Sequence, residues 1–81
     1  AEILEVIAET YEGIRDFATA VRFMRAAHAV RRDHLGAAHP VTLTSHVNLV
    51  FTYLAAAQMV EVVDAMTALA DHMDAARRDL P

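Results

Sequence analysis

Apolar residues recur every three or four positions along most of the chain, which is the spacing of one face of an α-helix. The first set predicts a helix over about residues 1–13, ending where Gly13 weakens it. The second set begins at Phe17 and runs toward Leu35, where Gly36 stops the helix. The two sets consist of Ile3, Leu4, Ile7, Ala8 and Tyr11, then Phe17, Ala20, Val21, Met24, Ala27 and Val30.

Two further helices are predicted in the second half of the chain. Pro40 suits the first turn of the third helix, because a residue there needs no N–H donor. The fourth helix is predicted from about Met59 to Arg78, after a break near Ala57. The apolar positions are Leu43, Val47, Leu49, Val50, Tyr53 and Leu54, then Val62, Val63, Met66, Leu69 and Met73. No strand pattern remains, so the fold class is all-α.

The two halves of the chain resemble each other at an offset of 42 residues, which places Tyr11 over Tyr53. The same offset pairs Ile7 with Leu49, Ala8 with Val50, Phe17 with Met59, Ala20 with Val62 and Met24 with Met66. A fixed period of this size is typical of stacked repeats. We therefore expect a single domain, residues 1–81, built from two helix hairpins at about 1–39 and 40–81. The chain is slightly shorter than two periods, so we expect it to be cut at repeat boundaries.

One segment resembles a known family. The run from Leu35 to Leu43 (LGAAHPVTL), followed by Asn48-Leu49 and Tyr53, resembles the 42-residue tetratricopeptide repeats of kinesin light chains. The resemblance implies antiparallel helix pairs stacked into a right-handed solenoid. It also implies a concave groove, lined by the first helix of each pair, in which peptides or partner helices bind.

The second repeat departs from the family pattern at several positions. Val50, Val62 and Leu69 stand where the family prefers small residues, and Ala57 stands in place of its usual glycine. The fourth helix is therefore expected to pack loosely on the third or to act as a terminal cap. Ala38 replaces the frequent aspartate before His-Pro, so a helix cap is expected to be missing there.

Four carboxylates recur along the first helix at spacings of three, four and three: Glu2, Glu5, Glu9 and Glu12. Such spacings place side chains on one face of a helix, which by the family resemblance is the groove side. This face could bind a basic peptide or an arginine-bearing helix, or it could be a solvated surface. Acid–base catalysis is disfavoured because no nucleophile or cofactor motif accompanies the carboxylates.

The matching face of the third helix offers Thr44, Asn48, Phe51 and Leu54. Asn48 resembles the family asparagine that hydrogen-bonds the backbone of a bound peptide, since an amide both donates and accepts. The alternative is an asparagine that packs between helices or faces solvent. Phe51 and Leu54 could anchor a partner, or they could be covered by the next repeat of a longer chain.

Composition narrows the function further. Hydrophobic residues make up 56% of the 81 positions, which suggests apolar faces that meet another repeat or another copy. The net charge of −4 disfavours nucleic acid and anionic lipid as partners. The absence of cysteine fits a cytoplasmic protein, and the chain has no apolar run of membrane-spanning length. No pair of the five histidines has the helical spacing of metal ligands, so neither metal nor cofactor is expected.

These observations favour a protein-interaction module whose groove, between the first and third helices, binds a peptide or helix of a partner protein. The alternative is a structural segment of a longer repeat protein that only self-associates. An enzyme is not expected.

Overall fold

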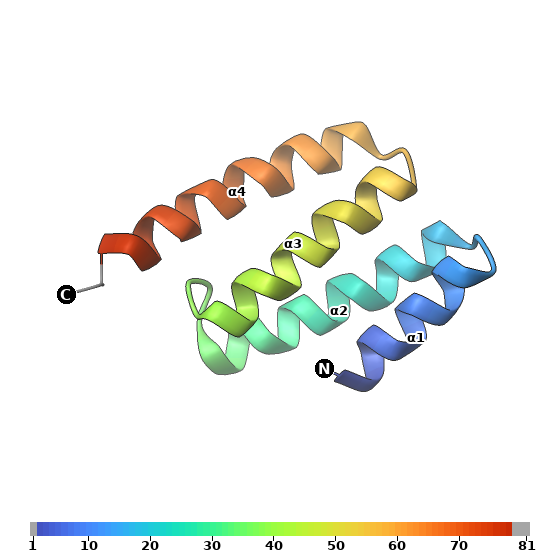
Figure 1. The fold of residues 1–81 in the computed structure, drawn as a ribbon, viewed down its shortest axis with the longest axis horizontal. Helices are drawn as coiled ribbons and strands as arrows, with labels where there is room; N and C mark the ends of the chain where they lie inside the picture. Colours follow the sequence, from blue (N-terminus) through green and yellow to red (C-terminus); the bar gives the residue numbers. More distant parts are fainter. Residues whose placement is uncertain (1, 79–81) are drawn as a thin grey trace.

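The computed structural model describes residues 2–78, which form four α-helices and no strand. These are α1 (Glu2–Gly13), α2 (Phe17–Leu35), α3 (Pro40–Ala55) and α4 (Met59–Arg78) (Figure 1). The all-helical class is confirmed, and each described helix end lies at or next to the predicted position. The predicted positions 1 and 79–81 lie outside the described residues.

The turns after α1 and after α3 have the same backbone hydrogen bonds, 42 residues apart. In the first turn, the Asp16 N–H donates to the Tyr11 carbonyl at 2.8 Å; in the second, the Gln58 N–H donates to the Tyr53 carbonyl at 3.0 Å. Arg15 and Ala57, one residue earlier, both have positive φ, 65° and 57°. Both helices therefore end in the same left-handed turn, which explains why glycine would suit position 57.

The connection between α2 and α3 is capped at both ends. The Gly36 N–H donates to the Arg32 carbonyl at 2.9 Å, and the φ of 92° at Gly36 is a conformation that glycine adopts without strain. At the start of α3, the His39 Nδ1 accepts the Val41 N–H at 3.1 Å. The expectation of a missing cap at Ala38 is thus wrong, because the neighbouring imidazole supplies the acceptor.

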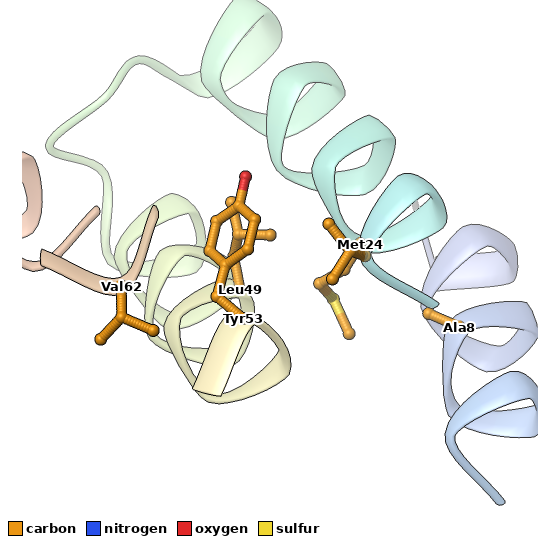
Figure 2. Close-up of a cluster of buried hydrophobic side chains, with 6 residues drawn as sticks. Ala8, Met24, Leu49, Tyr53 and Val62 are labelled. Atoms are coloured by element: carbon orange, nitrogen blue, oxygen red, sulfur yellow. The ribbon is translucent and has the colours of Figure 1, made fainter. Parts of the chain in front are cut away.

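The four helices share one apolar core, and the closest backbone packing is between helices that are neighbours in the chain. The buried residues Ala8, Val21, Met24, Leu49, Tyr53 and Val62 form a cluster to which every helix contributes (Figure 2). Fully buried alanines at positions 8, 20 and 27 allow close approach of the helix backbones. Tyr11 and Phe23 stack with ring centroids 5.7 Å apart, which adds an aromatic contact between α1 and α2.

The last helix is covered much less than the others. Among the described residues of α4, Val62 is the buried one, whereas the apolar side chains of Val63, Met66 and Met73 are exposed. Figure 1 shows α4 separating from α3 toward its C-terminal end. This arrangement agrees with the expectation that α4 packs loosely on α3.

Candidate partner-binding groove

A hollow of about 160 Å³ lies where α1 and α3 approach each other. Met24 of α2 contributes to its wall, and the remaining lining residues are Glu9, Glu12, Asn48, Phe51 and Thr52. Four of the eight predicted site residues, two from each helix, therefore come together. The hollow joins an exposed aromatic ring, an amide and two carboxylates.

Phe51 is the dominant apolar feature of this hollow. Its side chain is 63% exposed, although phenylalanine is a residue type that is commonly buried. Asn48 precedes it by three residues on α3 and is also exposed, so its amide is accessible beside the ring. An exposed aromatic anchor next to a donor–acceptor group is an arrangement found in protein interfaces.

Glu12 joins α1 to α3. The Thr52 hydroxyl lies 3.0 Å from Glu12 Oε1 and 2.8 Å from the Asn48 carbonyl, and its single proton can be donated to either acceptor. The Thr52 side chain is almost fully buried, whereas Glu12 keeps partial access to the hollow. When the proton is donated to Glu12, the hydrogen bond links the two helices that line the hollow.

Glu5 forms an ion pair with Arg31 of α2 and does not line the hollow. Both its oxygens face the Arg31 guanidinium of α2, with N–O distances of 2.6 and 3.1 Å, and each side chain is 17% exposed. The predicted acidic face is therefore divided. Seven residues make nearly two full turns of a helix, so side chains seven positions apart lie on the same side. Glu5 and Glu12 form one such pair, and both contact other helices. Glu2 and Glu9 form the other pair, and both are exposed.

Thr44 and Leu54, the remaining predicted residues, lie outside the lining of the hollow. Both are exposed on α3, and the Thr44 hydroxyl donates to the Pro40 carbonyl at 3.1 Å. Thr44 thus has a local partner in its own helix. Leu54 extends the exposed apolar surface one turn beyond Phe51.

A cluster of three histidines was missed by the sequence reasoning, which considered spacing within one helix. His28 of α2, His46 of α3 and His72 of α4 lie in a row, with ring centroids 4.6 and 5.9 Å apart. Burial, followed by the charge of His46, lowers the pKa of His28 to about 4, and burial also lowers the pKa of His46. The imidazoles of His28 and His46 are therefore neutral near pH 7. Across residues 2–78, no group of three possible ligands is placed to hold a metal ion.

A larger apolar hollow, about 890 Å³, lies between the α2–α3 connection and the C-terminal half of α4. Leu35, Leu43 and Met73 contribute its largest apolar side chains, and the alanines at positions 75 and 76 leave the space unfilled. It marks the place where α4 diverges from α3.

Within the described part of the chain, no helix is both long and apolar enough to cross a membrane. Comparisons with protein-family models, with curated proteins and with solved structures give no match for this chain.

Proposed function

We propose that this chain is a protein-interaction module that binds a peptide or a helix of a partner protein in the groove between α1 and α3. The exposed ring of Phe51 is the single observation that carries the proposal, because it stands beside the accessible amide of Asn48. Burying a phenylalanine side chain against a partner contributes about 1.5–3 kcal/mol. No catalytic role is part of the proposal.

The proposed architecture is a pair of tetratricopeptide-like repeats, in which antiparallel hairpins α1–α2 and α3–α4 stack as a right-handed solenoid. The matching turns at residues 14–16 and 56–58 support this arrangement, since both follow a helix that ends with the same hydrogen bonds. The sequential packing and the elongated dimensions of 44 × 26 × 15 Å are also those of a stack.

The groove would select its partner by three contacts. Phe51 accepts an apolar side chain, and Asn48 pairs with the partner's backbone through its amide. Glu9 and Glu12 favour arginine, whose planar guanidinium can donate two hydrogen bonds to one carboxylate. The expected ligand is a short basic segment with one large apolar residue.

Selection from a displayed library of random peptides tests this proposal. We expect enriched peptides to combine arginine with an aromatic or aliphatic residue, and Phe51→Ala to weaken their binding at least about tenfold. Val60→Glu is the matched control, because Val60 is an exposed apolar residue on α4, outside the groove. Peptides that bind Phe51→Ala as well as the unmodified chain would refute the groove.

The second candidate is a structural role, in which the chain only self-associates or continues a longer stack. It is favoured by the exposed apolar residues of α4 and by the exposure of Leu54. Under this alternative, no peptide selected for binding would depend on Phe51 and Asn48 together.

A further inference from the structure

The packing of α3 on α2 shows what covers the second helix of a repeat. The Thr42 hydroxyl donates to the Arg31 carbonyl at 3.3 Å, and the rings of His46 and His28 are in contact. Under this cover, Val21 and Met24 of α2 are each 4% exposed and belong to the core cluster.

Within residues 2–78, no helix covers the equivalent surface of α4. Val63 and Met66 occupy the positions of Val21 and Met24, 42 residues later, and are 61% and 54% exposed. Ala70 and Met73, which correspond to His28 and Arg31, are exposed as well. We define the α4 face as Val63, Met66, Ala70 and Met73. These four residues recur at helical spacing and form one apolar stripe.

A complementary surface is present at the other end of the same chain. Within α3, Ser45 and Thr52 are buried, and Ala56, just after its end, packs against the core cluster. Their equivalents 42 residues earlier are Ile3, Thr10 and Ile14, which are all exposed. We define the α1 face as Ile3, Thr10 and Ile14.

We infer that the α4 face binds the α1 face of a second copy, so that α1 lies on α4 as α3 lies on α2. The chain's own α2–α3 interface is the template, and the proposed contact continues it. This inference is independent of the proposed groove, because neither Phe51 nor Asn48 belongs to either face.

Charge at the helix ends agrees with this pairing. The short connection at residues 36–39 places the start of α3 next to the end of α2. If α1 of a second copy lies on α4 in the same way, the exposed Glu2 in the first turn of α1 lies next to the last turn of α4, with Arg77 and Arg78. Opposite charges therefore meet at this end of the contact.

The proposed contact joins two different surfaces, the α4 face of one copy and the α1 face of the next. An open row of copies therefore keeps a free α1 face at one end and a free α4 face at the other. Such head-to-tail association grows with protein concentration and does not close at a dimer unless the rotation forms a ring. Blocking one face on each of two chains stops growth at a single pair.

Sedimentation of the unmodified chain and of two blocked variants tests this inference. Met66→Glu blocks the α4 face and Ile3→Glu blocks the α1 face, both at exposed helical positions. We expect the mass of the unmodified chain to rise with concentration. Each variant alone should require at least about tenfold more protein to associate, because one buried apolar side chain is lost. An equimolar mixture of the two should form a pair of two protomers.

Val60→Glu is the control, because Val60 is 71% exposed and corresponds to Ala18, which stays exposed although α3 covers α2. It should associate like the unmodified chain. Circular dichroism checks that each variant keeps its helicity; Met66→Gln replaces Met66→Glu, and Ile3→Gln replaces Ile3→Glu, where the glutamate variant does not. A monomeric unmodified chain, a self-associating Ile3→Glu chain or a mixture that stays monomeric would overturn the inference.

Discussion

Arg15 and Ala57 lie 42 residues apart and share a left-handed backbone conformation, with φ of 65° and 57°. Each lies two residues after the end of a helix. The residue that follows Arg15 donates its N–H to the Tyr11 carbonyl, and the residue that follows Ala57 donates its N–H to the Tyr53 carbonyl. The two halves therefore share a turn geometry even though glycine, the residue best suited to it, is absent from both positions.

Replacing Ala57 with glycine should stabilise the fold. A Cβ atom in the left-handed region costs about 1–2 kcal/mol, and the added freedom of glycine in the unfolded chain returns part of this. We expect the free energy of unfolding in urea to rise by about 0.5–1 kcal/mol. Ala26→Gly, at an exposed position within α2, is the control and should lower stability by about 1 kcal/mol. A loss of stability in Ala57→Gly would contradict the shared turn.

The ion pair between Glu5 and Arg31 should stabilise the packing of α1 on α2. Its two side chains are mostly buried, so Glu5→Gln is expected to cost about 1–2 kcal/mol, between the values for exposed and buried pairs. Glu9→Gln, on the exposed side of the same helix, should leave stability unchanged. A double-mutant cycle with Arg31→Gln in urea unfolding measures the coupling. Zero coupling would show that the pair contributes nothing.

Partner binding should depend on Glu9 and on salt. Glu9 is exposed at the groove, and exposed charges are screened beyond about 8–10 Å at 0.1–0.15 M salt. We expect a basic peptide selected on the unmodified chain to bind Glu9→Gln more weakly, with a smaller loss when salt is raised. Titrations of both proteins at low and high salt measure this. Equal affinities that do not respond to salt would mean that Glu9 is only a solvated side chain.

Acid should destabilise the protein through the histidine row. His28 binds a proton below about pH 6.5 when unfolded but only near pH 4 when folded, so the unfolded chain binds more protons between these values. The free energy of unfolding should therefore fall as pH is lowered from 6.5 to 4, and His28 should add no further loss below that. After burial, the charges of His46, Arg32 and His72 also lower the pKa of His28, and the carboxylates of Glu61 and Asp64 line a hollow together with His28.

Urea unfolding of His28→Gln at several pH values isolates this contribution. We expect a smaller loss of stability between pH 6.5 and 4 than in the unmodified chain. His34→Gln, at an exposed position of the same helix, should keep the full pH dependence. If His28→Gln and the unmodified chain lose the same stability, the pKa of His28 is not lowered.

Metal ions should have no effect on the fold. His28, His46 and His72 are close, but no three possible ligands among residues 2–78 are placed around a common point. A chelator is expected to leave helicity and the melting midpoint unchanged. Stoichiometric, tight zinc binding in a calorimetric titration would contradict this.

The helix boundaries could be predicted from the sequence because their signals are local. Gly36 ends α2 and Pro40 begins α3, each at its own position, and the spacing of apolar residues indicates the extent of each helix directly. The cap at His39 was missed because imidazole is a less common capping acceptor than aspartate.

The candidate site could be predicted only in part. Glu9, Glu12, Asn48 and Phe51 line one hollow, as expected from helical spacing within α1 and α3 and from the 42-residue offset that makes the two helices equivalent. The contact of Glu5 with Arg31 depends on how α1 is rotated against α2, and no spacing within one helix reports that rotation. The histidine row has the same origin, since each of its members comes from a different helix.

Amide shift mapping by NMR tests the interaction groove most directly. A selected basic peptide is titrated into the isotope-labelled chain, and the shift of every backbone amide is followed. We expect the largest changes in α1 and α3 around Glu9, Asn48 and Phe51, and we expect Phe51→Ala to require at least about tenfold more peptide to produce them. Changes confined to α4 or to the α2–α3 connection, with α1 and α3 unmoved, would contradict this expectation.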